Sequence, residues 1–249
     1  MCTNGLDEAH CPNAVHHAVE VAGTFQQYCV TDGRYATRIP KGVTDEVAGP
    51  IMCGGFSAYA ACKRSAVKPG QWIVILRGGG GVGHFAVQYA KAMGMRVIAV
   101  DGGKEKGQMC RDLGAEVFID FRECKDMAAD VKKITTYGTH GALVAAPTKE
   151  AYDMAPLLLR PRGTLVALAI PKDPSIIAGT SAALVGGNRM NIVGSLVGTK
   201  KEAEEALDFT ARGLVHPVLT KGSIDEIDKY CDLLTAGRIP GRVVVKVSP

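Results

Sequence analysis

The chain has 249 residues, of which 47% are hydrophobic, and this content supplies a sizeable core. Its 29 basic and 25 acidic residues give a net charge of +4 and lie spread along the chain, without the basic runs of a nucleic-acid groove. No stretch approaches the ~18 consecutive apolar residues of a membrane span, and the N-terminus, MCTNGLDEAH, lacks the features of a secretory signal. Composition therefore excludes nucleic acid and membrane as expected partners and predicts a globular cytoplasmic protein.

The eight cysteines are mostly scattered singly, which is not the pattern of a secreted disulfide framework. Free cysteine behaves as a small hydrophobic residue in most protein interiors. We therefore predict buried or half-buried thiols at Cys62, Cys110, Cys124 and Cys231.

Residues 1–55 are predicted to be largely irregular. Chain-breaking residues recur throughout this segment, at Pro12, Gly23, Gly33, Pro40, Gly42, Gly49 and Pro50. One strand is expected, over residues 24–31.

Residues 72–101 are the most informative segment and read WIVILRGGGGVGHFAVQYAKAMGMRVIAVD. Two continuous apolar runs, 72–76 and 96–100, have the character of strands buried on both faces. Between them apolar residues recur at helical spacing and predict one buried helix face, formed by Val82, Ala86, Tyr89, Ala90 and Met93. The order strand, glycine turn, helix, strand and acid predicts a dinucleotide-binding βαβ unit.

The glycine turn aligns as Gly78-x-Gly80-x-x-Gly83. The first glycine permits the tight turn, the second lets the backbone approach a pyrophosphate, and the third lets the helix pack closely on the strand. The helix that opens there presents unpaired N–H groups and the positive end of its dipole. We therefore expect the cofactor's phosphates to lie on Gly78, Gly80, Gly81, Val82 and Gly83.

Asp101 follows Gly83 by 18 residues and is predicted to accept hydrogen bonds from the adenosine ribose hydroxyls. Such a carboxylate favours NAD over NADP, because it repels a 2′-phosphate. The competing interpretation is a structural glycine turn without a ligand. Arg77, just before the turn, points either to solvent, which we favour, or to a phosphate.

Strands and helices continue to alternate after Asp101. Strands are expected over residues 117–121, 142–146, 164–170 and 191–197, and helices over 104–113, 125–135, 149–159 and 178–186. Six strands with intervening helices make a complete doubly wound parallel α/β sheet, with the nucleotide over the carboxyl ends of the strands.

The two flanks leave this alternation. The tail is predicted to hold amphipathic helices over residues 201–211 and 225–236 and a last strand over 242–247. With the N-terminal segment it is interpreted as a second, mostly β domain that the nucleotide domain interrupts. The expected boundaries are 1–55, 56–198 and 199–249.

Several segments resemble, in order and spacing, the microbial yeast-type zinc alcohol dehydrogenases of the medium-chain dehydrogenase family. They include GTFQQYCVTDGRYATRIPKGV, AGPIMCGGFSAYAACKRSAVKPGQWIVI, AVQYAKAMGMRVIAVDGG, NIVGSLVG and GRVVVKV, and the resemblance runs from about Cys11 to the C-terminus. It implies a Rossmann domain that binds NAD and a GroES-like catalytic domain, here truncated and split between the two flanks. It also implies hydride transfer between a primary or secondary alcohol or aldehyde and NAD(H), with zinc as Lewis acid.

By position, the resemblance implies roles for five residues of this chain. Cys53 matches the third ligand of the catalytic zinc, and Ser57 matches a hydroxyl residue near the nicotinamide. Asp101 and Lys106 match residues that bind the adenosine ribose, and Arg242 matches an arginine that reaches the pyrophosphate.

The zinc sites implied by the resemblance are incomplete in this chain. Roughly the first hundred residues of the family pattern precede its start, including a cysteine and a histidine of the catalytic site, which needs three protein ligands. Of the four-cysteine structural site only Cys2 and Cys11 have counterparts, at an altered spacing. We therefore predict that Cys53 is a packed thiol and that zinc is not fully held. Rescue of the structural site by His10, His16 or His17 is the less favoured interpretation, against solvated loop histidines.

Three functional hypotheses follow from these residues. The first is an NAD-dependent alcohol dehydrogenase whose activity is impaired by truncation of its zinc-binding domain. The second is a non-catalytic protein that binds NAD(H) and has lost the chemistry. The third is a zinc-free reductase of the quinone or enoyl type, which Asp101 disfavours because such enzymes usually use NADPH.

The resemblance also implies a homo-oligomer. The family pairs its nucleotide domains through the strand corresponding to residues 191–197, which begins at Asn191 and ends at Val197 and needs such a cover at the sheet edge. Apolar surface is expected where the N-terminal part of the pattern is missing. We therefore predict poor solubility of this chain when it is expressed alone.

Overall fold

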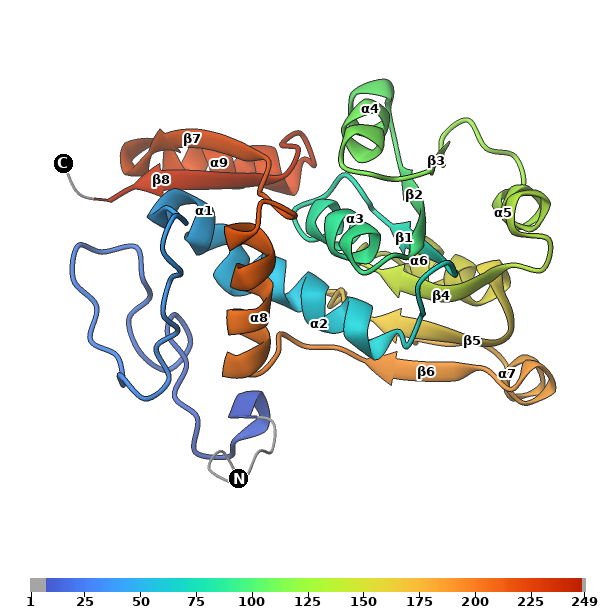
Figure 1. Cartoon of the computed structure of the whole chain (residues 1–249), viewed down its shortest axis with the longest axis horizontal. Helices are drawn as coiled ribbons and strands as arrows, with labels where there is room; N and C mark the ends of the chain where they lie inside the picture. Colours follow the sequence, from blue (N-terminus) through green and yellow to red (C-terminus); the bar gives the residue numbers. More distant parts are fainter. Residues whose placement is uncertain (1–7, 248–249) are drawn as a thin grey trace.

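A six-stranded parallel sheet forms the middle layer of the larger lobe of the protein (Figure 1). The computed structural model describes residues 8–247. The strand order is β3-β2-β1-β4-β5-β6, so the direction of travel across the sheet reverses between β1 and β4. The strands are β1 (Trp72–Leu76), β2 (Arg96–Asp101), β3 (Val117–Asp120), β4 (Thr139–Val144), β5 (Leu159–Ala167) and β6 (Asn191–Gly194). This is the order of a doubly wound dinucleotide-binding fold, and the predicted fold class is confirmed.

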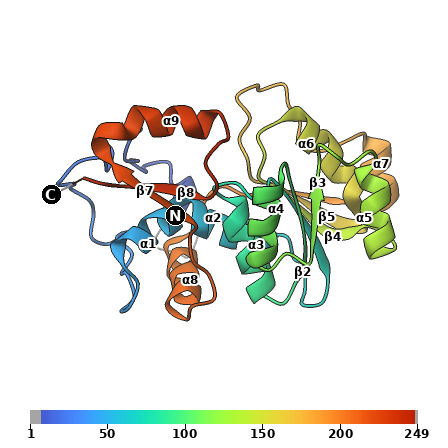
Figure 2. The same cartoon turned by 90° about the horizontal axis from the view of Figure 1, so that it is seen from above.

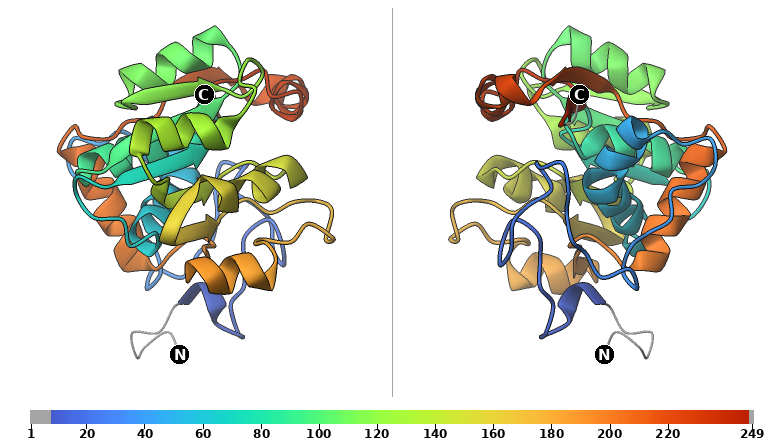
Figure 3. Two further views of the ribbon diagram at one scale, coloured as in Figure 1. Left: turned by 90° about the vertical axis from the view of Figure 1, so that its right-hand side faces the viewer. Right: turned by 90° about the vertical axis from the view of Figure 1, so that its left-hand side faces the viewer.

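Helices connect the successive strands and cover both faces of the sheet (Figure 3). They are α3 (Gly83–Ala92), α4 (Lys104–Asp112), α5 (Met127–Thr135), α6 (Lys149–Met154) with the 3-10 turn η4 (Ala155–Leu158), and α7 (Ala182–Asn188). The central strand β1 is buried along its whole length, and its side chains alternate between two cores. Ile73 and Ile75 face the core that contains α3, whereas Val74 faces the core that contains α6.

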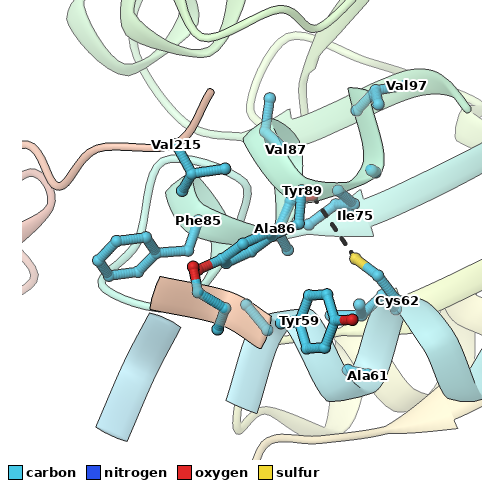
Figure 4. Packing of buried hydrophobic residues seen from close by; sticks show 14 of the residues in the cluster. Tyr59, Ala61, Cys62, Ile75, Phe85, Ala86, Val87, Tyr89, Val97 and Val215 are labelled. Atoms are coloured by element: carbon cyan, nitrogen blue, oxygen red, sulfur yellow. Dashed lines mark hydrogen bonds between the residues drawn. The ribbon is translucent and has the colours of Figure 1, made fainter. Parts of the chain in front are cut away.

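The larger core lies between α3, α2 (Phe56–Arg64) and α8 (Lys200–Ala211) (Figure 4). The rings of Tyr59 and Tyr89 meet edge to face, with centroids 5.4 Å apart. The Tyr89 hydroxyl donates to the carbonyl oxygen of Ala206 at 3.1 Å, and the Cys62 thiol donates to that of Ala86 at 3.7 Å. These contacts join the sheet to the elements that precede and follow it in the chain.

A second lobe lies beside the sheet (Figure 2). It contains α1 (Asp45–Pro50) and the π-helical segment η3 (Ile51–Gly55), which runs directly into α2. Its C-terminal part is a parallel strand pair, β7 (Leu219–Ser223) and β8 (Arg242–Lys246), joined through the 3-10 turn η5 (Ile224–Glu226) and α9 (Ile227–Thr235). An ion pair between Glu46 of α1 and Lys221 of β7 connects the two sequence-distant parts.

The flanks differ most from the sequence prediction. They contain a single two-stranded sheet within residues 8–247, so the expected β-rich character is limited to β7 and β8. Helices α1 and α2, the segment η3 and strand β7 were not predicted. The strand expected over residues 24–31 is wrong, because no other strand in the described part of the chain pairs with it. Its apolar side chains are exposed instead, Tyr28 by 88% and Val30 by 94%.

Several element ends also differ from the prediction. Strand β6 stops at Gly194 rather than Val197, whose φ of 40° is incompatible with a strand. Strand β5 begins earlier than expected and ends at Ala167, and α7 begins at Ala182 after Ser181, whose hydroxyl caps it. Cys62 and Cys110 are buried and Cys124 is half-buried, as predicted, but Cys231 is exposed because α9 lies on the surface.

The N-terminal segment runs as an irregular loop along the outer side of the molecule (Figure 3, right). It begins with the 3-10 turn η2 (Glu8–His10), and its regular pairing over residues 11–44 is one isolated bridge, His17 to Val21. Several of its large apolar side chains are exposed, including Val15, Val19, Phe25, Tyr28 and Val30. The predicted apolar surface is therefore present, while poor solubility stays a prediction.

The start of α3 approaches the end of β1 so closely that position 83 has no room for a side chain. A Cβ atom at Gly83 would lie 1.9 Å from the carbonyl oxygen of Arg77. We expect Gly83→Ala to lower the free energy of unfolding by more than about 3 kcal/mol, because backbone must move on both sides. Urea denaturation measures this change.

Gly186→Ala is the matched control. Gly186 lies in α7 with no atom within 4 Å of its ideal Cβ position, so alanine should be neutral or stabilise by up to about 1 kcal/mol. Equal effects of the two substitutions would contradict the packing described at Gly83.

Candidate nucleotide-binding site

The glycine turn connects β1 to α3 at the carboxyl end of the sheet. A Cβ atom at Gly78 would lie 2.9 Å from the Cβ of Ala99 on β2, so this position and Gly83 both require glycine. Above Gly80 the nearest atoms are those of the Arg77 side chain, at 3.0 Å from an ideal Cβ. A flexible side chain can move away, so the backbone at Gly80 is accessible to a ligand that displaces it.

Three consecutive backbone N–H groups of this turn have no hydrogen-bond acceptor. Those of Gly81, Val82 and Gly83 make no hydrogen bond within residues 8–247, whereas the neighbouring N–H groups of Gly80 and His84 bond to Arg77 and Gly80. The three donors lie in the turn that leads into α3, where the helix dipole adds partial positive charge. The turn therefore offers a ready set of donors to an anion.

Arg77 has a left-handed backbone conformation, with φ 68°, and is half-buried. Its side chain lies against Gly80 rather than extending into solvent, the orientation favoured from the sequence. A cation is thus already present beside the free N–H groups.

Asp101 ends β2 next to the turn and is only 5% exposed. Its Oδ2 accepts a hydrogen bond from the Gly79 N–H at 2.9 Å, and its Oδ1 accepts one from Gly102 at 2.8 Å. The ammonium of Lys106 lies 3.3 Å from Oδ1. A carboxylate has about four acceptor positions, so at least one is left for a further donor. The long contact to Lys106, which is itself partly exposed, can open to provide another.

Arg242, the first residue of β8, forms the opposite wall of the site. Its Nη1 would lie 3.2 Å from a Cβ atom at Gly81 and 3.4 Å from one at Gly54. The second lobe therefore reaches the glycine turn through this guanidinium. The structure brings together predicted residues from three distant parts of the chain, namely the turn with Asp101 and Lys106, Arg242, and the segment that contains Cys53 and Ser57.

Ser57 and Cys53 lie one helical turn apart where η3 passes into α2. The Ser57 hydroxyl is 7% exposed and donates to the carbonyl oxygen of Cys53 at 2.6 Å. The thiol of Cys53 is exposed, so the prediction of a packed thiol is wrong.

Residues 8–247 contain no group of three or more His, Cys, Asp or Glu side chains that could hold a metal ion. Cys53 and Cys11 thus lack a ligand set in the described part of the chain, and Cys2 lies outside it. In the N-terminal loop His16 pairs with Glu20, and His17 contacts only one sulfur, that of Cys29, with Nδ1 3.6 Å away. The ligand groups of residues 8–247 therefore do not fit a zinc ion.

His84, in the first turn of α3, was not recognised from the sequence. It is fully buried, its Nδ1 lies 3.0 Å from the carbonyl oxygen of Gly80, and its Nε2 has no hydrogen-bond partner. Burial lowers the pKa of its ring to about 4, with the positive charge of Arg242 acting in the same direction. The ring is therefore neutral near pH 7 and holds the turn through Gly80.

Gln88, one turn further along α3, links the helix to the second lobe. Its amide nitrogen donates to the carbonyl oxygen of His216 at 2.9 Å, and its amide oxygen accepts from the His216 N–H at 3.0 Å. The sequence did contain a signal for these two residues. His84 and Gln88 are polar, lie four positions apart and therefore share one face of a mostly apolar helix.

Comparison with known proteins places the chain among dehydrogenases. The sequence pattern described as zinc-binding dehydrogenase matches residues 81–212. Alcohol dehydrogenase 1 of Neurospora crassa is 39% identical over 245 residues, which cover 97% of this chain and 69% of that protein. The crystal structure of the alcohol dehydrogenase from Aeropyrum pernix superimposes with a TM-score of 0.86 at 28% identity, over 96% of this chain and 70% of that one. Acetophenone reductase from Geotrichum candidum, solved in complex with NAD, shares the fold with a TM-score of 0.83 at 24% identity, over 95% and 66% of the two chains.

The low pKa of His84 predicts acid sensitivity. Between pH 6.5 and about 4 the unfolded chain binds a proton that the folded chain does not, so this residue destabilises the fold as the pH falls through that range. The loss is at most roughly 3 kcal/mol. We expect His84→Asn, which cannot titrate but keeps a donor for Gly80, to reduce the fall in Tm between these pH values.

The comparison uses the difference between the wild type and the variant, in which the contributions of all other titrating groups cancel. If the Tm values of wild type and variant fall in parallel between pH 6.5 and 4, His84 binds its proton in the folded protein as readily as in the unfolded chain. That result would contradict the buried, neutral ring.

Proposed function

Because this chain belongs to the zinc-binding dehydrogenase family, we propose that it binds NAD(H) over the carboxyl ends of β1 and β2 for hydride transfer with an alcohol or aldehyde. The observation that carries the proposal is the pairing of a buried carboxylate, Asp101, with a turn that has three free N–H donors. These two features match the two ends of an adenosine diphosphate group. Two of the three proteins named above, from Neurospora crassa and Aeropyrum pernix, are alcohol dehydrogenases, which supports this substrate class.

In this proposal the pyrophosphate lies on the N–H groups of Gly81, Val82 and Gly83, with the guanidinium of Arg242 against its outer side. Charged hydrogen bonds between guanidinium and phosphate oxygens are stronger than neutral ones. Gly78 and Gly80 keep the backbone bare, so that the phosphates reach it. Arg77, which now lies over Gly80, turns to the phosphate when the cofactor enters.

Asp101 accepts the hydroxyls of the adenosine ribose, and Lys106 moves from its carboxylate to the ribose. The backbone N–H groups of Gly79 and Gly102 fix the carboxylate in place, so little order is lost on binding. Its negative charge selects NAD(H), because the 2′-phosphate of NADP(H) would approach it closely. This preference argues against a reductase of the quinone or enoyl type.

Ser57 is the proposed residue on the nicotinamide side. Its hydroxyl proton is committed to the carbonyl oxygen of Cys53, so its oxygen is free to accept a hydrogen bond. When bound, NAD supplies the hydride acceptor of alcohol oxidation. The chain's residues bind and orient that cofactor, and no step through zinc is derived.

A second candidate function is NAD(H) binding without turnover. The isolated, exposed Cys53 favours it, since no second or third ligand group accompanies this thiol in residues 8–247. Binding with no alcohol oxidation in the presence of zinc would select this candidate.

No helix in residues 8–247 has the length and apolar character needed to cross a membrane. The cytoplasmic location inferred from the sequence stays a prediction.

We expect Asp101→Asn to weaken NADH binding about tenfold, because a neutral amide replaces a charged acceptor of the ribose hydroxyls. NADPH binding should weaken less or improve, since the repulsion of its 2′-phosphate is removed. The ratio of the two Kd values, measured by isothermal titration calorimetry at one salt concentration, checks both expectations.

Asp112→Asn is the control, because Asp112 is an exposed acid at the end of the same helix as Lys106. Its Kd values should equal those of the wild type. Unchanged NADH affinity in Asp101→Asn would show that the proposed position of the ribose is wrong.

We also propose that the protein forms a homo-oligomer through the free edge of β6. Within the described residues strand β6 has one neighbour in the sheet, β5, and exposed apolar side chains lie on the strand and just after it, with Ile192 41% and Leu196 48% exposed. An exposed apolar edge strand is a template for pairing with another strand. A second copy in antiparallel orientation would continue the sheet through the interface.

Light scattering coupled to size-exclusion chromatography tests this pairing. We expect Ile192→Lys to shift the protein toward the monomer, because a charge on an edge strand disfavours pairing with another strand. Leu234→Lys on α9, where the native leucine is 44% exposed, is the control and should keep the wild-type mass. A wild-type protein that is monomeric throughout would refute the proposed interface.

A further inference from the structure

A polar cavity lies at the opposite end of the sheet from the glycine turn. Its volume is about 440 Å³, and its lining comes from the amino ends of four strands and the loops that precede them. Lys68 lies on the loop before β1, His140 in β4, and Arg160 and Arg162 in the first half of β5. No Asp or Glu lines it.

The three cations of this pocket have no acidic partners. Lys68, Arg160 and Arg162 form no ion pair with a carboxylate anywhere in residues 8–247. The contrast with neighbouring cations is clear, because Lys63 pairs with Glu205 and Arg96 pairs with Glu116. Like charges that share a cavity repel one another, and a cavity of one sign concentrates ions of the other.

The hydrogen bonds around His140 leave a surplus of donors. The backbone N–H of Trp72 points at its Nδ1, 3.3 Å away, and the Nη1 of Arg160 lies 2.9 Å from its Nε2. A neutral imidazole accepts at only one nitrogen, so one of these two donors faces another N–H. Burial and the charge of Arg160 lower the pKa of His140, which keeps the ring neutral. An anion beside Arg160 and the ring would accept the unmatched proton if the Arg160 side chain moves toward it.

We propose that this basic pocket, defined by Lys68, His140, Arg160 and Arg162, binds a small phosphate-bearing anion. Three cationic side chains suit a phosphate, which carries about two charges and three acceptor oxygens. A single carboxylate would leave most of these donors unmatched. The planar guanidinium groups of Arg160 and Arg162 favour bidentate contacts with phosphate oxygens.

The pocket is independent of the proposed NAD(H) site. Its residues precede or begin the strands, whereas Asp101 and the glycine turn follow the ends of β2 and β1. The proposal therefore holds or fails without regard to the cofactor.

Inorganic pyrophosphate is the probe, titrated calorimetrically into the full chain at constant ionic strength. We expect Arg160→Gln combined with Arg162→Gln to raise its Kd by about tenfold or more, since two charged hydrogen-bonding groups are lost. Lys68 lies on an exposed loop, so Lys68→Gln should leave Tm unchanged and raise the Kd by a smaller factor. This variant keeps the test valid if the double arginine variant does not fold.

Two control variants separate the pocket from other sources of binding. Arg242→Gln removes the cation at the glycine turn, where pyrophosphate is also expected to bind, and should retain the binding event that the double arginine variant weakens. Lys125→Gln with Lys133→Gln removes two exposed charges elsewhere and should keep the wild-type Kd. The proposal is overturned if pyrophosphate does not bind, if only Arg242→Gln weakens it, or if the lysine pair weakens it as much as the arginine pair.

Discussion

The close approach of α3 to β1 at Gly83 is the constraint on which the rest of the structure depends. The helix can begin directly against the strand only because position 83 carries a hydrogen atom where any other residue has a carbon. That start directs the axis of α3 across the sheet and leaves the preceding N–H groups without acceptors. The same contact therefore sets both the packing of the larger core and the donor array of the candidate site.

The second lobe is positioned by contacts with α3 rather than by a large sheet of its own. Gln88 binds both backbone groups of His216, and Tyr89 binds the backbone of α8, so two adjacent residues of α3 hold the C-terminal part. Arg242 then approaches the glycine turn from that part. A ligand held between Arg242 and the turn would therefore contact both lobes at once.

Prediction from the sequence was most accurate where the local pattern of apolar residues and glycines coincides with the burial seen in the structure. Continuous apolar runs predicted β1 and β2, and the spacing of glycines with Asp101 located the candidate site, because these signals arise within a single βαβ unit. The structure of the flanks was harder to predict, because it depends on pairing with segments that are distant in the sequence. Residues 24–31 have strand-forming composition but no strand to pair with, and β7 exists because β8, about twenty residues later, lies beside it. Cys53 and His84 show the same limit for single side chains, since the burial of each is decided by neighbours that composition does not reveal.

Trp72, the only tryptophan in the chain, gives these observations a spectroscopic consequence. It begins β1, is 8% exposed, and lies under the guanidinium of Arg96, whose Cζ is 3.9 Å from the ring. Its backbone N–H points at His140 in the basic pocket. The emission maximum of the native protein therefore reports on the amino ends of the strands, at the far end of β1 from the glycine turn. A spectral shift caused by a molecule bound at that turn would therefore report a change that reaches the opposite end of the sheet.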